Sequence, residues 1–368
     1  MASFRDRHRV SSILTLILCG VLAGCGDDPS APVAGTAAVG PPGSLEGPFG
    51  HRGAWLASRE GYPLDSNHGS EILRHMRGLG VNIVAVGQEV EMPSMRAPEL
   101  KWGDGDAALR SFLRRARRAG LHSFLLPRIE SPDFFKPPYP FRADIDFATK
   151  SEWGSFHANM ERMVLHYARL AEAEGVAVFG LGLELKHSVR KFADFWRGLI
   201  AKVRRVYRGK ITYSANWYDE WHGIEFWSDL DFIGVGAYFE LKGPEPVGRA
   251  TKAQLVERWS PIVAQLSAVA KRTGRPVLFT EVGYTGYVDC AERPWEWAGK
   301  AAKGIAIDHD VQARATGALM EIVRSREFFA GLFVWSFYTK PTLAAPWEYA
   351  VQGRPAEAAL RRAYLRAN

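Results

Sequence analysis

The stretch AEAEGVAVFGLGLEL at residues 171–185 holds, in order, the end of a helix, a glycine, an apolar strand and a glutamate. The residues up to Glu174 follow a helical pattern, and Gly175 stands where a left-handed residue commonly ends a helix. Val176–Leu181 is a continuous apolar run, which is typical of a strand covered on both faces in a parallel sheet. The stretch therefore predicts a helix–strand unit with Glu184 just beyond the carboxyl end of the strand.

The same alternation recurs on both sides of this stretch. Further strands are expected over Ala54–Ala57, Val81–Val86, Ser123–Leu126, Ile211–Ala215, Phe232–Ala237, Val277–Thr280 and Gly331–Trp335. Helices are expected over Ser70–Leu79, Asp106–Ala119, Glu152–Glu174, Arg190–Tyr207, Lys252–Arg272, Val311–Arg326 and Ala356–Leu365. Repeated strand–helix units favour an α/β fold, and eight of them favour one closed (β/α)8 TIM barrel over an open sheet. No Gly-rich phosphate loop follows the first strand, which weakens a nucleotide-binding interpretation.

The N-terminal residues have the pattern of an export signal. Three arginines precede an apolar run over residues 13–24, which is too short to span a bilayer as a lone helix. The run ends in Leu22-Ala23-Gly24-Cys25, which resembles a bacterial lipobox. By that resemblance residues 1–24 are a lipoprotein signal peptide, and a lipid on Cys25 anchors an exported protein to the cell envelope. An ordinary secretory signal is the alternative.

The remainder divides into a tether and one domain. Residues 25–47 contain no aromatic residue and are rich in Gly, Pro, Ala and Ser, which predicts a flexible tether. No comparable linker follows, so residues 48–368 are expected to form a single barrel domain. The net charge of +7 is modest, and arginines over residues 110–118 suit a solvated helix face. We therefore expect no nucleic-acid partner, and we expect a monomer.

Two predicted strands run into a glutamate. Glu184 follows the strand in the opening stretch, and Glu281 directly follows Val277–Thr280. A carboxylate there is costly unless it is solvated, paired or used in chemistry. Strands four and seven of a closed barrel face each other across the mouth, where active sites of this fold lie. Glu184 and Glu281 are therefore candidate catalytic residues, and structural salt bridges at the rim are the alternative.

A retaining glycosidase needs two carboxyls that face each other. One attacks the anomeric carbon, and the other protonates the leaving oxygen and then activates water. Aromatic and amide side chains crowd the same predicted rim, where they could stack on sugar rings and hydrogen-bond to hydroxyls. The candidate substrate-binding residues are Asn216, Trp217, Tyr238, Tyr284 and Trp335.

Several segments resemble glycoside hydrolase family 113. They are Lys101-Trp102-Gly103-Asp104, Gly182-Leu183-Glu184-Leu185, residues 211–217, residues 230–239 and residues 279–284. The characterised members are endo-β-1,4-mannanases, and they belong to a large group of retaining barrel glycosidases. The resemblance implies a (β/α)8 hydrolase that cleaves a β-linked polysaccharide or oligosaccharide, such as β-1,4-mannan, by double displacement. It implies neither a metal ion nor another cofactor.

The resemblance also assigns roles to residues. Glu184 matches the acid/base, and Glu281 matches the nucleophile. Tyr238 matches a strand-six tyrosine that hydrogen-bonds the nucleophile and favours its ionised form. Trp335 matches the aromatic residue that forms the floor of the subsite beside the cleaved bond. Asn216 and Trp217 are expected to line the same cleft.

Two positions depart from the family pattern. Leu183 stands where Thr is common in the family and Asn in the wider group, a position that helps orient the sugar 2-hydroxyl. Arg128 follows Pro127, where a Lys before the Pro is expected. Both departures bear on the choice of sugar more than on glycosidase chemistry.

Other interpretations stay open at this stage. Asp219, Glu220 and His222 cluster in sequence, although their spacing is no standard metal-ligand pattern. Leu183 motivates a non-catalytic glycan-binding lipoprotein on a hydrolase-like barrel. A third possibility is an envelope protein whose barrel mouth binds another protein.

Overall fold

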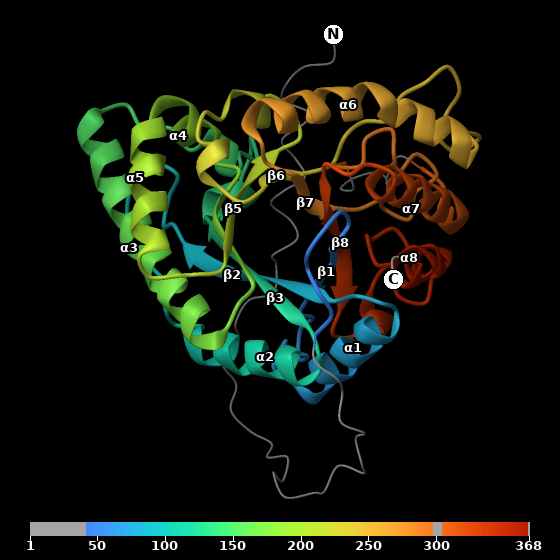
Figure 1. Ribbon diagram of the computed structural model, residues 1–368, viewed down its shortest axis with the longest axis horizontal. Coiled ribbons are helices and arrows are strands. Elements are labelled where there is room, and N and C mark those ends of the chain that lie inside the picture. The colour runs from blue at the N-terminus through green and yellow to red at the C-terminus, as the bar shows by residue number, and fades with distance from the viewer. Residues whose placement is uncertain (1–41, 297–303, 367–368) are drawn as a thin grey trace, which may run out of the picture.

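The computed structural model describes residues 42–296 and 304–366. The predicted signal peptide over residues 1–24, the lipidation site Cys25 and the tether up to residue 41 lie outside the described residues. Within these ranges the chain forms one closed barrel of parallel strands in the order β1-β2-β3-β4-β5-β6-β7-β8. Figure 1 shows helices arranged around the outside of these strands. The predicted (β/α)8 TIM barrel is confirmed.

All the predicted strands are present, with somewhat different ends. They are β1 His51–Ala57, β2 Ile83–Glu91, β3 His122–Glu130, β4 Val178–Leu183, β5 Lys210–Asn216, β6 Ile233–Gly236, β7 Val277–Val282 and β8 Phe329–Tyr338. The α-helices are α1 Asn67–Gly78, α2 Asp106–Arg118, α3 Lys150–Glu174, α4 Lys186–Lys191, α5 Ala193–Arg204, α6 Lys252–Thr273, α7 His309–Arg324 and α8 Pro355–Leu365. Short 3₁₀ helices are η3 Pro132–Phe135, η4 Arg142–Asp144, η5 Trp221–Gly223, η6 Trp227–Asp229 and η8 Pro341–Leu343.

The helical parts differ from the prediction in one place. The single helix expected over Arg190–Tyr207 is replaced by α4 and α5, which meet at Phe192 with a ψ of 51°. That value lies outside the α-helical region, so the chain bends there. As a result, α4 begins at Lys186, directly after the turn that carries Glu184. No helix was expected between β5 and β6, and the structure has the short η5 and η6 there.

The glycine at the end of α3 behaves as its position predicted. Gly175 has φ +67°, in the left-handed region, and its amide bonds back to the last turn of the helix. Glycine enters that region at little cost, whereas other residues are strained there. Gly209, directly before β5, does not have a positive φ. Glycine is needed there for space instead, because a Cβ would lie 2.2 Å from the Tyr207 hydroxyl.

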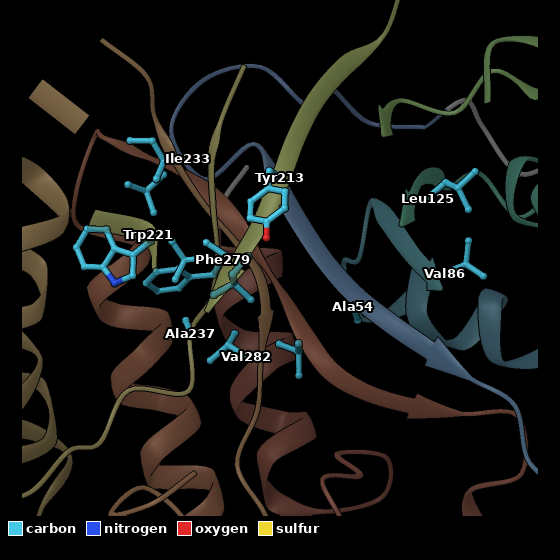
Figure 2. Close-up of a cluster of buried hydrophobic side chains, with 14 of the residues drawn as sticks. Ala54, Val86, Leu125, Tyr213, Trp221, Ile233, Ala237, Phe279 and Val282 are labelled. Atoms are coloured by element: carbon cyan, nitrogen blue, oxygen red, sulfur yellow. The ribbon is translucent and has the colours of Figure 1, made fainter. Parts of the chain in front are cut away.

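Two hydrophobic cores hold the barrel together. The larger one, the outer core, fills the space between the strands and the helices, and Figure 2 shows part of it, including Tyr213, Trp221 and Phe279. The smaller one, the inner core, fills the barrel interior and includes Trp55, Phe124 and Phe333. Alternate residues of a strand point to opposite faces, so these two cores separate inward from outward side chains. This separation decides which rim residues can reach the mouth.

The described end of the predicted tether lies against the barrel. The Asn82 side-chain amide donates to the Ser44 carbonyl at 3.1 Å, and a His122 ring nitrogen lies 3.0 Å from the Gly43 carbonyl. Leu45 packs against the inner core. In the ranges 42–296 and 304–366, none of the helices combines the length and apolar composition that a membrane crossing needs.

Candidate active site

Glu281 faces the mouth because β7 is irregular where it ends. Leu278 belongs to the inner core and Phe279 to the outer core, so regular alternation would send Glu281 outward. The pairing of β7 with β8 shifts register between Phe279 and Val282, and the pairing with β6 shifts before Glu281. Such bulges commonly re-aim a side chain at active sites. Here the bulge brings the carboxyl of Glu281 to the hydroxyl of Tyr238.

The environment of Glu281 holds opposing influences on its ionisation. Burial raises the pKa of Glu281 to about 7, while the hydrogen bond donated by the Tyr238 hydroxyl lowers it. The negative charge of Glu184 raises the same pKa. The positive charges of Arg128 and Arg142 lower it. A carboxyl with this pKa is part ionised near neutral pH.

Glu184 has an unusual backbone conformation. Its φ is +56°, in the left-handed region that non-glycine residues seldom adopt. The β4–β5 pairing shifts register between Gly180 and Leu183, and the Glu184 amide then donates to the Ser214 carbonyl at 2.9 Å. Only 8% of Glu184 is exposed. Conformations of this kind persist when surrounding contacts hold them, and they cluster at active sites.

A buried arginine that sequence reasoning missed contacts Glu184. Arg142, in η4, donates from one terminal nitrogen to Glu184 at 3.3 Å and from its Nε to the Ile129 carbonyl at 2.7 Å. Its other terminal nitrogen pairs with Glu130 at the end of β3. Only 2% of the arginine side chain is exposed. The predicted acid/base is therefore connected to the β3 loop by a buried charge network.

Arg128, the departure noted on the third strand, belongs to the same network. Its guanidinium donates to Glu130 at 2.8 Å. Burial raises the pKa of Glu130, but the charges of Arg142 and Arg128 and their hydrogen bonds leave it lower than usual. Glu130 is thus ionised and pairs with two arginines, one of which also contacts Glu184. The positive charge of Arg128 also lowers the pKa of Glu281.

Three of the predicted aromatic residues pack near Glu281 or inside the barrel. Tyr238 contacts Glu281, and Trp217 packs edge-on against Tyr238 with ring centroids 5.7 Å apart. Trp335 belongs to the inner core, where its ring centroid lies 5.5 Å from that of Trp55. The Trp335–Ser336 peptide bond is cis. Aromatic side chains therefore pack next to Glu281 and inside the barrel.

The two other predicted substrate-binding residues are buried. Tyr284 belongs to the outer core, where only 4% of it is exposed, on the helix side of the strands. Asn216 is fully buried, and its side-chain amide donates to Glu220 at 2.9 Å. Both residues follow strand ends in the sequence, but their side chains are committed to packing or to a buried partner.

The Asp219–His222 segment forms no metal site. Glu220 is buried against Tyr213 and Asn216, Asp219 pairs with Arg190 at 2.8 Å, and the His222 ring bonds to Gln265. In the part of the chain that the structure describes, no group of three or more His, Cys, Asp or Glu side chains is arranged to hold a metal ion.

Further aromatic residues reach the inner core from the loops after β7 and β8. Trp295 donates to Glu240 at 3.0 Å, and the Tyr349 hydroxyl donates to the Pro294 carbonyl. The Tyr349 ring lies 6.1 Å from that of Tyr238. These loop residues carry no strand or helix pattern, so only the folded chain reveals that they adjoin the mouth.

A (β/α)8 barrel with carboxyls at the ends of strands four and seven, and a tyrosine that donates to one of them, is typical of a glycoside hydrolase. The comparison with protein families agrees. The model of glycoside hydrolase family 113 matches residues 53–354, so the chain belongs to that family. The resemblance seen in the sequence is confirmed.

Solved structures show the same fold. A family 113 β-mannanase from Alicyclobacillus acidocaldarius, in complex with ManMIm, is similar with a TM-score of 0.75 and 24% identity, over 89% of this chain and 100% of that one. A family 113 β-1,4-mannanase shares 25% identity with a TM-score of 0.72, over 85% of this chain and 98% of that one. The search of curated proteins found no match.

Proposed function

We propose that this chain hydrolyses β-1,4-linked mannan with retention of anomeric configuration, with Glu281 as the nucleophile and Glu184 as the acid/base. The observation that carries the proposal is the placement of two carboxyls at the ends of β4 and β7 of one closed barrel, with the Tyr238 hydroxyl donating to Glu281. The choice of mannan is supported by a family 113 relative at 25% identity that is described as a β-1,4-mannanase.

The reaction has two displacements. In the first, a Glu281 oxygen forms a bond to the anomeric carbon while the bond from that carbon to the leaving oxygen breaks, and Glu184 gives its proton to that oxygen. In the second, Glu184 takes a proton from water, the water oxygen bonds to the anomeric carbon, and Glu281 departs as a carboxylate. Atoms and charge balance without any cofactor.

The surroundings suit these roles. The Tyr238 hydroxyl donates to Glu281, which stabilises the carboxylate before attack and again as it leaves. Trp217 packs against Tyr238, which itself contacts Glu281, and its partly exposed ring could stack on a sugar. Leu183, which is 8% exposed in the inner core, gives no hydrogen bond to a substrate. Other groups must therefore distinguish the configuration at C2.

The test is hydrolysis of β-mannans, β-glucans and xylans by the wild type and two variants. We expect product from mannan, a loss of about 10²- to 10⁴-fold in Glu184→Gln, and a comparable or greater loss in Glu281→Gln. Glu225→Gln, in which the side chain is 70% exposed, is the matched control and keeps wild-type activity. Wild-type turnover in both catalytic variants contradicts the assigned roles.

The alternative of a glycan-binding protein without turnover rests on Leu183. It predicts that the wild type binds mannan, measured by calorimetry or affinity electrophoresis, and releases no product under conditions where a known mannanase does. Product release that depends on Glu184 excludes this alternative.

We also propose that the mature chain is exported and carries a lipid on Cys25, as the lipobox-like residues 22–25 suggest. The expected result is incorporation of a labelled fatty acid in a bacterial host and fractionation with membranes. Cys25→Ser should lose both. A labelled Cys25→Ser protein, or a wild type without label, contradicts the anchor.

A further inference from the structure

Glu220 occupies a site that only a carboxylate can satisfy. It is fully buried in the turn after β5. One oxygen accepts from the Tyr213 hydroxyl at 2.6 Å, and the other accepts from the Asn216 backbone and side-chain nitrogens at 2.8 and 2.9 Å. All three partners donate, so a glutamine nitrogen in either orientation would leave a donor without an acceptor.

The hydroxyl of Tyr213 connects Glu220 to the loop that carries Glu184 through hydrogen bonds. Its single proton goes to Glu220, so its oxygen is left to accept a hydrogen bond from the Leu185 amide. Leu185 directly follows Glu184 in the chain. Tyr213 itself is fixed by the outer core, part of which Figure 2 shows, and its ring lies 5.2 Å from that of Trp196.

Two bonds from β5 therefore hold the backbone on both sides of Glu184. The Glu184 amide donates to the Ser214 carbonyl at 2.9 Å, and the next amide donates to the Tyr213 hydroxyl. Fixing the peptide units before and after a residue fixes its φ and ψ. Glu184 needs such support because its φ of +56° is strained for a residue with a side chain.

We propose that Glu220, acting through Tyr213, is a positioning residue that holds Glu184 in its left-handed conformation and so aims the acid/base carboxyl at the leaving oxygen. The inference rests on the proposed function for the role of Glu184, but the backbone support that it describes does not. Burial raises the pKa of Glu220 to about 7, and the hydrogen bonds from Tyr213 and Asn216 oppose that rise.

The first test separates acid catalysis from general damage. In an aryl β-mannotrioside, a dinitrophenolate leaving group departs without protonation. When mannan is cleaved, the acid must protonate the leaving sugar oxygen. We expect Glu220→Gln and Tyr213→Phe to lose about 10- to 100-fold in kcat/KM on mannan and much less in kcat/KM on the aryl substrate, because kcat/KM of the aryl substrate reports a first displacement that needs no acid. Glu225→Gln keeps wild-type values on both. Equal losses on the two substrates overturn the proposal.

The double variant tests whether the two residues act as one unit. Because Glu220 is proposed to act through Tyr213, the loss in the double variant should equal that of the larger single variant. Losses that multiply contradict the connection. Tyr213→Phe keeps the ring in the outer core, so it reports on the missing hydroxyl even if Glu220→Gln folds poorly.

Hydrogen exchange at the Leu185 amide tests the support directly and needs no substrate. The amide should exchange faster in Tyr213→Phe and Glu220→Gln than in the wild type and in Glu225→Gln. Unchanged exchange overturns the inference. Failure of the proposed function has a different signature, namely a wild type without turnover or a Glu184→Gln variant that retains it.

Discussion

At the scale of single residues, the site depends on how two glutamates are aimed. The sequence predicts both from their position after apolar runs, and the family resemblance adds their roles. It cannot show that a bulge turns Glu281 inward or that Glu184 adopts φ +56°, because neither feature has a local composition signal. Arg142 was missed for a related reason: it lies in a loop without periodic pattern and is buried only by tertiary contacts.

The hydrogen bond from Tyr238 should set the acidic side of the pH profile. Glu281 must be ionised to attack, so kcat/KM should rise with pH and level off above its pKa of about 7. Tyr238→Phe removes a bond that lowers this pKa, so the acidic limb should move to higher pH and activity at pH 6 should fall. Rates measured from pH 4 to 9 check this. An acidic limb that stays in place or moves to lower pH contradicts the role of Tyr238.

At the scale of elements, the strands were the most predictable part. Apolar runs located every one, because burial on both faces leaves a strong sequence signal, and a glycine marks the start of several of them. The division of one expected helix into α4 and α5 was not predictable, since Phe192 does not break helices by its type. Tyr284 shows the same limit: it follows β7 in sequence but packs outward among the helices.

The end of α3 permits a matched pair of glycine substitutions. Gly175→Ala places a Cβ at φ +67° and should destabilise the protein by about 1 kcal/mol or more. Gly154 lies in the same helix, and a Cβ added to it would meet no atom within 4 Å, so Gly154→Ala should stabilise by up to about 1 kcal/mol. Urea unfolding measures both. Destabilisation by both substitutions, or by neither, contradicts this account of the α3 end.

At the scale of the whole molecule, ionisation of the buried Glu281 should lower the free energy of unfolding as pH rises. Folding raises the pKa of Glu281 from 4.5 to about 7, so the folded state holds this proton more tightly than the unfolded state. As pH rises through that window the unfolded state releases its proton first, and stability falls by at most about 1.4 kcal/mol per pH unit. Above about pH 7 both states are ionised and the loss levels off.

Glu281→Gln should remove this share of the pH dependence. We expect the free energy of unfolding of the variant to match that of the wild type near pH 4.5 and to exceed it at pH 8, by up to about 3 kcal/mol. Thermal unfolding between pH 4 and 8 provides the measurement. The exposed Glu225→Gln should follow the wild type throughout. If stability depends on pH in the same way in Glu281→Gln and in the wild type, ionisation of Glu281 does not destabilise the folded state.

The central claim is that Glu281 forms a covalent bond to the sugar. A mannobioside with fluorine at C2 and a good leaving group slows the second displacement, so the glycosyl-enzyme should accumulate. Mass spectrometry of the digested protein should place the added sugar on the peptide that contains Glu281, and a Glu281→Gln protein should remain unlabelled. A label on another residue, or turnover to an inverted product with no label, contradicts the account.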